Sequence, residues 1–228
     1  MVVSVLLGLF FTAAIPSYAG LLLGGEVVVV DPGHGGYDPG AVRRGVREKD
    51  INLQIALKLK ECLEQTGARV ILTRSGDYNL AVPGLHGKDA HRYDLEKRLE
   101  EAQRSGAGIF VSIHANCVRG GYGGGAEVYY HPGPEECRLL AECVQEELRS
   151  IPGIRKRLAK TREYYVLRNA NIPAVLVEVG FMDNPGERKK LTGAEYQELL
   201  SRKVACGILR FRLMRLLGYG EGGNTLAP

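Results

Sequence analysis

The sequence predicts an α/β fold: a single-domain three-layer sandwich in which a mostly parallel, mixed sheet carries helices on both faces. Continuous apolar runs, such as Val27 to Val30 and Gly108 to Ile113, are typical of strands buried on both faces. Helix-like segments separate these runs, which favours parallel strands joined by crossovers. The length of 228 residues, with no internal repeat or interdomain linker, suits one core.

The first elements can be placed from apolar spacing and from Pro and Gly. The strand over 27–30 is expected to stop at residues 31–36, where Pro and Gly force a loop. Residues 50–65 carry apolar side chains at near-helical spacing, and Gly67 ends this helix. A strand over 69–73 follows.

The rest of the chain repeats this alternation after a polar, Gly-containing loop over 74–87. Each predicted helix has apolar residues along one side, as expected for packing on a sheet. The predicted elements are helices over 91–105, 135–149 and 195–217 and strands over 108–113, 126–130, 164–167 and 174–179.

The two ends are expected to lie outside the folded domain. Residues 1–25 contain an uncharged apolar run, Val2 to Ile15, followed by the small-x-small sequence Ser17-Tyr18-Ala19. This pattern predicts a signal peptide or a membrane-anchor segment, although no Lys or Arg follows Met1; a buried first strand is the alternative. We therefore expect an exported, extracytoplasmic protein, with residues 1–20 as its membrane contact if they are retained. Residues 26–217 form the predicted domain, and 218–228 a flexible tail.

Charge and cysteine usage exclude several classes of protein. The net charge of +4 and pI near 8.8 suit an anionic polymer such as cell wall, a membrane surface or nucleic acid. No recognition helix or basic cluster interleaved with aromatic residues is found, so we expect no nucleic-acid partner. The five cysteines contain no CxxC pair, which leaves a zinc ribbon or thioredoxin-like motif unsupported.

Three predicted strands end at side chains that can bind a metal or transfer a proton. His34 follows the first strand, His114 ends the strand over 108–113, and Glu178 ends the run that begins at Ala174. Functional groups gather beyond the carboxyl ends of parallel strands. Together with Glu48, just before the first helix, two imidazoles and one carboxylate make a common catalytic zinc set.

Each of these residues also has an ordinary structural interpretation. A lone histidine at a strand end is commonly a hydrogen-bonded structural residue, and Glu48 suits the first turn of a helix. The glycines around His34 could form a phosphate cradle, but the Gly-Lys-Ser/Thr of a P-loop is missing. Glu178 is harder to explain, because a buried carboxylate is costly unless paired or protonated, and a raised pKa suits a general base. The other histidines, His86, His91 and His131, fit a metal site less well.

Four motifs resemble those of the zinc-dependent N-acetylmuramoyl-L-alanine amidases. They are Val29-Val30-Asp31-Pro32-Gly33-His34-Gly35-Gly36, Glu48-Lys49-Asp50, Ser112-Ile113-His114-Ala115-Asn116 and Val177-Glu178-Val179-Gly180-Phe181. The resemblance covers roughly residues 26–217. It implies one zinc ion bound by His34, Glu48 and His114, with Glu178 as the catalytic residue, and hydrolysis of the amide between N-acetylmuramic acid and L-alanine in peptidoglycan.

Within this family, the chain looks most like the germination-specific amidases of the spore cortex. That resemblance implies removal of peptides so that muramic-δ-lactam can form. An accessory sporulation protein is a candidate partner besides the peptidoglycan substrate, and whether one is needed stays open. Asn116, Arg168 and Asn169 are further candidates for substrate binding, and the loop 120–125 for a groove wall. The alternatives are a vegetative cell-wall amidase, a zinc carboxypeptidase acting on wall peptides, and a non-catalytic wall-binding protein.

Overall fold

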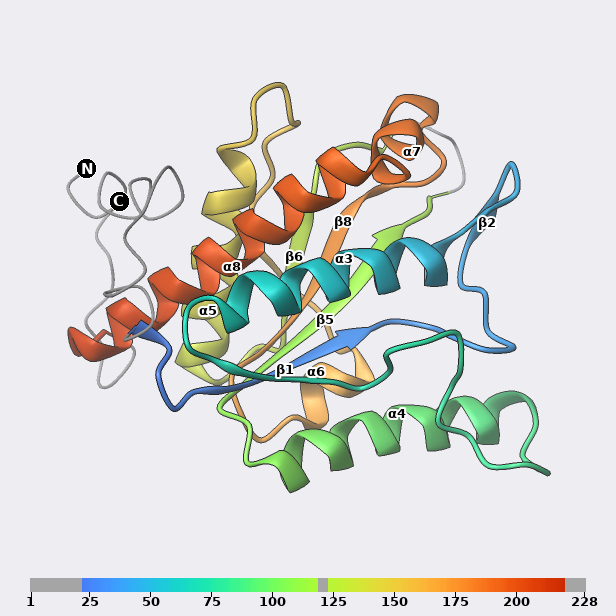
Figure 1. Cartoon of the computed structure of the whole chain (residues 1–228), viewed down its shortest axis with the longest axis horizontal. Helices are drawn as coiled ribbons and strands as arrows, with labels where there is room; N and C mark the ends of the chain where they lie inside the picture. The colour runs from blue at the N-terminus through green and yellow to red at the C-terminus, as the bar shows by residue number, and fades with distance from the viewer. Residues whose placement is uncertain (1–21, 119–122, 220–228) are drawn as a thin grey trace.

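A twisted sheet forms the centre of the molecule (Figure 1). The computed structural model describes residues 22–118 and 123–219. Within them, six strands lie in the order β4-β1-β5-β8-β6-β7. All neighbouring strands pair in parallel except β6 and β8, which are antiparallel, so the predicted mixed, mostly parallel sheet is confirmed. The strands are β1 (Val27–Pro32), β4 (Arg69–Leu72), β5 (Ile109–Asn116), β6 (Glu127–Tyr130), β7 (Lys160–Thr161) and β8 (Ala174–Phe181).

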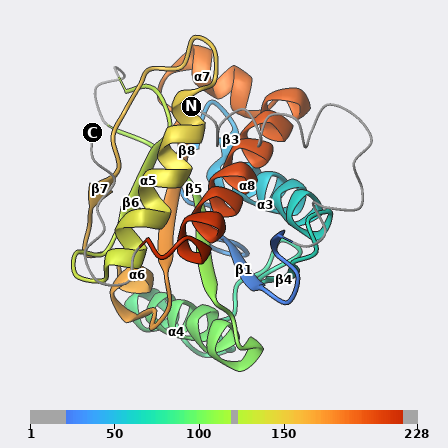
Figure 2. The same ribbon diagram turned by 90° about the vertical axis from the view of Figure 1, so that its left-hand side faces the viewer.

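Helices cover both faces of the sheet, which confirms the three layers (Figure 2). One face packs against α3 (Glu48–Glu64), α5 (Glu135–Arg149) and α8 (Ala194–Leu216). The other face packs against α4 (Gly87–Ser105) and the short α6 (Tyr165–Asn169). Because side chains alternate along a strand, Val28 and Val30 enter the first of these two cores and Val29 the second. Such a strand has to be apolar on both faces, as the sequence indicated.

Several predicted boundaries were wrong. Residues 164–167, predicted as a strand, belong mostly to α6, because Val166 and Leu167 fill the apolar gap between α4 and β8. Helix α4 begins at Gly87 and not at His91. Helix α3 begins at Glu48, so this residue lies in its first turn and not before it.

Short elements escaped the prediction because their residues carry little periodicity. They are the β2–β3 hairpin (Val42–Arg43 and Val46–Arg47), the two-residue strand β7, and α7 (Pro185–Leu191). The hairpin leads directly into α3. It therefore determines where the side chain of Glu48 enters the fold.

Some sequence predictions concern residues outside the described part of the chain. They include the apolar run within 1–21, the tail residues 220–228, and residues 119–122 of the glycine-rich loop. Among the helices of residues 22–118 and 123–219, none is long and apolar enough to cross a membrane. All five cysteines are free, and Cys62, Cys143 and Cys206 are buried, as expected for small apolar side chains.

Candidate metal centre

The predicted site residues meet at the carboxyl-terminal edge of the sheet. Strand β1 runs into the loop that carries His34, while β5 carries His114 and β8 carries Glu178. His114 and Glu178 are direct partners in the parallel register, which places both side chains on the same face of the sheet. Glu48 enters from the first turn of α3. The parallel order of β1, β5 and β8 thus brings together residues that are far apart in the sequence.

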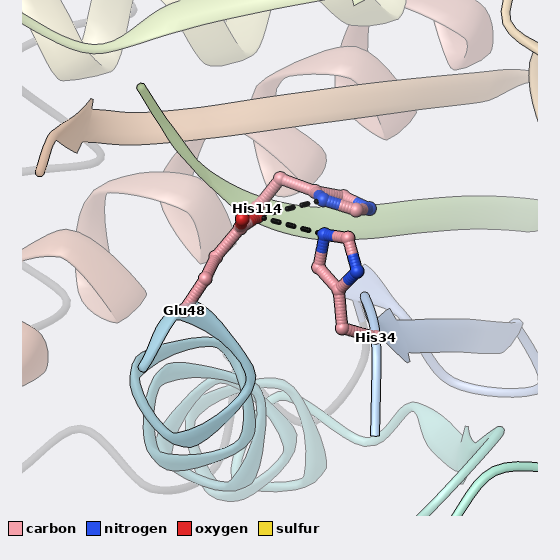
Figure 3. A group of neighbouring side chains, drawn as sticks. All are labelled: His34, Glu48 and His114. Atoms are coloured by element: carbon pink, nitrogen blue, oxygen red, sulfur yellow. Dashed lines mark hydrogen bonds and ion pairs between the residues drawn. The ribbon is translucent and has the colours of Figure 1, made fainter. Parts of the chain in front are cut away.

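His34, Glu48 and His114 form a compact cluster (Figure 3). One nitrogen or oxygen from each side chain lies within 4.8 Å of the corresponding atoms of the other two. The Glu48 Oε1 atom is 3.0 Å from His114 Nδ1 and 3.2 Å from His34 Nε2. The two imidazole rings meet edge to face, with centroids 4.9 Å apart. These atoms can converge on one cation with only small movements.

Asp38 holds the imidazole of His34 from the other side. Its Oδ2 atom is 2.7 Å from His34 Nδ1, which leaves Nε2 to face Glu48. Burial alone would lower the pKa of His34, but the hydrogen bonds with Asp38 and Glu48 raise it to about 10. Carboxylates in this position fix the ring orientation of metal-binding histidines and increase their basicity. Asp38 is thus a candidate functional residue that the sequence interpretation missed, although its place four residues after a candidate ligand was a usable signal.

Glu48 is buried, and its carboxylate is tightly held. Oε2 accepts a hydrogen bond from the backbone N–H of Ala41 at 2.9 Å, and Oε1 accepts one from Ala115 at 3.2 Å. Burial tends to raise the pKa of Glu48, but hydrogen bonds from His114 and His34 outweigh it and lower that pKa strongly. The group is therefore a carboxylate at all ordinary pH values, which is the form that binds metal ions.

Two glycines leave room for the cluster. A Cβ atom on Gly33 would lie 2.2 Å from both Cε1 and Nε2 of His114. A Cβ on Gly40 would lie 2.7 Å from Glu48 Oε2 and from His34 Cδ2, and Gly40 has a φ of +63°, which disfavours any side chain. Glycine is thus required at positions 33 and 40, because the backbone passes too close to the side chains of the cluster for a Cβ atom to fit.

Glu178 lies beside the cluster and is only 9% exposed. Its Oε2 atom is buried and has no hydrogen-bond partner within the described residues. Burial, followed by repulsion from Glu48, raises its pKa to about 8. The carboxyl group can therefore gain or lose a proton near neutral pH, as a general acid–base group must.

A cleft of about 490 Å³ opens over the cluster and Glu178. Its lining includes the predicted substrate-binding residue Asn116 and also Tyr164, Tyr165 and Leu176. His91 also lines this cleft but is not part of the cluster, in agreement with the expectation that it fits a metal site less well. The cleft thus combines the polar side chains of the cluster with aromatic and apolar side chains.

The other two predicted substrate-binding residues lie elsewhere. Arg168 is exposed and lines a separate cavity with His131 and Cys137. Asn169 lines a third cavity beside Leu99 and donates to the backbone carbonyl of Tyr165 at 2.7 Å. The sequence placed them between two predicted strands, just before the strand that leads to Glu178, whereas in the structure they end helix α6 and neither lines the cleft. Their predicted role in substrate binding finds no support in the geometry.

Comparison with known proteins places this site within a family. Residues 28–210 match the N-acetylmuramoyl-L-alanine amidase family. The chain belongs to this family. It is an amidase that acts on peptidoglycan, and the recognition made from the four motifs is confirmed.

Relatives of known name and structure support the same assignment. The germination-specific N-acetylmuramoyl-L-alanine amidase of Bacillus subtilis is 34% identical over 84% of this chain and 81% of that protein. The CwlD amidase of Clostridioides difficile, solved in complex with the GerS lipoprotein, is 38% identical, with a TM-score of 0.79 over 82% of this chain and 98% of its own. The amidase AmiC2 of Nostoc punctiforme is 37% identical, with a TM-score of 0.72 over 82% and 97%. This amidase fold therefore extends over the whole central sheet of the chain.

Proposed function

We propose that this amidase binds one zinc ion through His34, Glu48 and His114 and uses Glu178 to transfer protons during amide hydrolysis. The observation that carries the proposal is the convergence of two imidazoles and one carboxylate beside buried Glu178, whose Oε2 atom has no hydrogen-bond partner among the residues that the structure describes. Two histidines and one acidic residue form a common catalytic zinc set, which leaves a position open for water or substrate.

The residues present fit zinc in both chemistry and space. Histidine nitrogen and carboxylate oxygen are common ligands of catalytic zinc, and the three candidate atoms already lie within 4.8 Å of one another. The space is kept free of side chains by Gly33 and Gly40. When bound, the ion would supply Lewis acidity to the scissile carbonyl and to water. Binding requires that both imidazoles be neutral, so uptake of the metal would release any protons they carry.

Glu178 is proposed to take a proton from the attacking water and return it to the leaving amine. Its carboxyl group faces the same side of the sheet as His114 and has a free oxygen. A cation at the three ligands would lower the pKa of Glu178 from its value of about 8, because positive charge favours the carboxylate. Asn116, which lines the cleft, is proposed to form a hydrogen bond with the substrate.

Replacing Glu178 by Gln tests this role. We expect Glu178→Gln to keep zinc but to lose hydrolysis by about 10²-fold or more, because the amide cannot accept the proton. Activity is measured as release of L-alanine amino groups from purified peptidoglycan, and zinc by elemental analysis of the same protein. Near-normal release of amino groups by the variant would refute the proposed role of Glu178.

The bond that is cut also needs a direct test, because a zinc carboxypeptidase would use similar chemistry. Mass spectrometry of the digest distinguishes the two activities. We expect an intact stem peptide that begins with L-alanine, in accordance with the family. Release of single amino acids from the carboxyl end of the peptide would instead support the carboxypeptidase.

We further propose that the enzyme acts outside the cytoplasm, on spore-cortex peptidoglycan, to prepare the glycan for muramic-δ-lactam formation. Support comes from the relative named germination-specific and from the CwlD amidase, which was solved with a lipoprotein. A similar accessory lipoprotein is the proposed partner, and residues 1–25 the proposed export or anchoring segment. Faster hydrolysis of cortex-type than of vegetative peptidoglycan is expected; the opposite preference would favour a vegetative wall amidase.

A further inference from the structure

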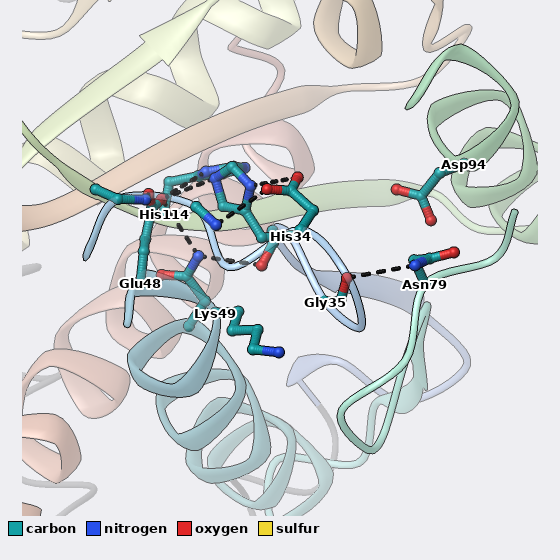
Figure 4. A network of polar contacts seen from close by, with 12 residues as sticks. His34, Gly35, Glu48, Lys49, Asn79, Asp94 and His114 are labelled. Atoms are coloured by element: carbon teal, nitrogen blue, oxygen red, sulfur yellow. Dashed lines mark hydrogen bonds and ion pairs between the residues drawn. The ribbon is translucent and has the colours of Figure 1, made fainter. Parts of the chain in front are cut away.

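The loop that carries His34 is held by side chains from other parts of the fold. Figure 4 shows Lys49 of α3, Asn79 of the loop after β4 and Asp94 of α4 arranged around it. Successive carbonyl groups of this loop accept hydrogen bonds from side chains. The donors are Arg74 to Pro32 and Gly33, Arg98 to Pro32 and His34, Asn79 to Gly35, and Lys49 to Gly36.

Arg98 has the central position in this arrangement. It is only 1% exposed, so its charge is removed from water. Asp94 accepts from Nε at 2.8 Å, and Asp31 accepts from Nη1 at 2.7 Å. With both carboxylates in place, the guanidinium plane has one orientation, and its Nη2 atom donates to the backbone carbonyl of His34 at 2.9 Å. A planar fork of fixed orientation gives a directional contact that a flexible ammonium group cannot reproduce.

The backbone of His34 requires such a constraint. Its φ is +63°, in the left-handed region that side chains other than those of glycine rarely adopt. A residue keeps this conformation only where its surroundings over-determine it. The hydrogen bond from Arg98 fixes the carbonyl of His34, while Asp38 fixes the imidazole of the same residue. Both are needed to direct Nε2 at Glu48.

We propose that Arg98 is a positioning residue of the metal centre. Its guanidinium group, oriented by Asp31 and Asp94, holds the His34 carbonyl and thereby aims the imidazole at Glu48 and His114. Arg98 acts through His34 and is not itself part of the cluster. The inference rests on the proposed function, since it concerns the geometry of a zinc ligand.

A purely structural role is the alternative, and the contacts argue against it. Buried ion pairs are often no more stabilising than apolar residues of the same volume, so stability alone is a weak reason for burying a triad of charges. Two of the bonds donated by Arg98 end on the loop carbonyls of Pro32 and His34, next to the metal cluster. The triad thus joins β1 and α4 to a ligand residue.

The test compares the zinc affinity of the purified full chain with that of Arg98→Met and Arg98→Lys. Affinity is measured by competition with a chromogenic chelator, at a temperature where circular dichroism shows each metal-free protein to be folded. We expect Arg98→Met to weaken zinc binding by about 10- to 100-fold, the usual effect of removing a group that orients a ligand. The zinc affinity of Arg98→Lys should lie between those of the unmodified chain and Arg98→Met, because lysine keeps the positive charge but lacks the planar guanidinium group.

A matched control separates positioning from stability. Leu148→Ala removes a buried side chain of α5 on the opposite face of the sheet. It should lower the melting temperature without changing zinc affinity. If the Arg98 variants do not fold, Asp94→Asn loosens the same guanidinium group while keeping Arg98 and Asp31, and a several-fold loss of zinc affinity is expected.

The outcomes distinguish this inference from the proposed function. If the unmodified chain binds zinc no better than His34→Ala, the proposed function fails. If the unmodified chain binds zinc tightly and folded Arg98→Met binds it equally tightly, only the positioning role is overturned. If the Arg98 variants do not fold but Asp94→Asn does, unchanged zinc affinity of Asp94→Asn overturns the positioning role of Arg98.

Discussion

A single contact with His114 explains why the residue before His34 is a glycine. Gly33 has no strained φ, so its need for glycine comes from space alone: the ring of His114 occupies the position of a Cβ atom. The sequence alone does not tell which side chain approaches which glycine. That information depends on the pairing of β1 with β5.

A methyl group at Gly33 therefore tests the cluster geometry. Gly33→Ala should displace the His114 ring, lower the zinc content and reduce amide hydrolysis by about 10²-fold, the loss of rate that a misplacement near 1 Å can cause. Gly186→Ala is the matched control, since its added Cβ would be 3.4 Å from the nearest side-chain atom of Asn184. Equal activity of the two variants would show that the space beside His114 is not needed.

Helix α3 and strand β8 show what could be predicted at the level of elements. The apolar runs predicted β1, β5 and β8, and their ends correctly located His34, His114 and Glu178. Glu48 was less predictable, because a first-turn acid is common in any helix and only the β2–β3 hairpin explains its direction. Helix α6 was missed because Tyr165 and Val166 have strong strand propensities that tertiary packing overrides.

Strand β1 and helix α4 are joined by a charge pair that should make stability depend on pH. Although burial favours the protonated form of Asp31, Arg98 and the hydroxyl groups of Ser112 and Thr73 lower its pKa. Because the pKa of Asp31 is lower in the folded state, its charge stabilises the protein at pH values above the pKa of the unfolded state, about 3.9. This stabilisation is lost as the pH falls below that value.

Asp31→Asn is expected to lower the free energy of unfolding at pH 7 by about 3–5 kcal/mol, since it leaves Arg98 with one carboxylate fewer. The difference from the unmodified protein should shrink as pH falls below about 4. Urea unfolding of the metal-free proteins between pH 3 and pH 7 measures it. A difference that stays constant over this range would show that the charge of Asp31 does not contribute.

The topology of the whole molecule accounts for the convergence of the site. Neighbouring parallel strands β1, β5 and β8 end at one edge, and the cleft opens there. The fold class and the convergence of the four candidate residues were accessible from the sequence, partly through the family resemblance. The buried network of Asp31, Arg74 and Arg98 was not, because polar residues in a predicted loop and helix give no sign of being buried.

Zinc should stabilise the whole fold, since the ligands come from three separate elements. At a free zinc concentration about 1,000 times the dissociation constant, the gain is about 4 kcal/mol, or roughly 10 °C in melting temperature. Differential scanning calorimetry with and without a chelator measures the shift. His34→Ala, which lacks one ligand, should show a much smaller zinc-dependent shift in melting temperature. A shift equal to that of the unmodified protein would indicate that zinc binds elsewhere.

The most direct test of the metal centre is the zinc content of the purified protein and of three variants. Elemental analysis is made on the unmodified chain and on His34→Ala, Glu48→Ala and His114→Ala, each confirmed as folded by circular dichroism. The proposed site predicts about one zinc ion per unmodified chain and substantially less in every variant, because each loses one of three protein ligands. Unchanged zinc content in the three variants would contradict the proposed site.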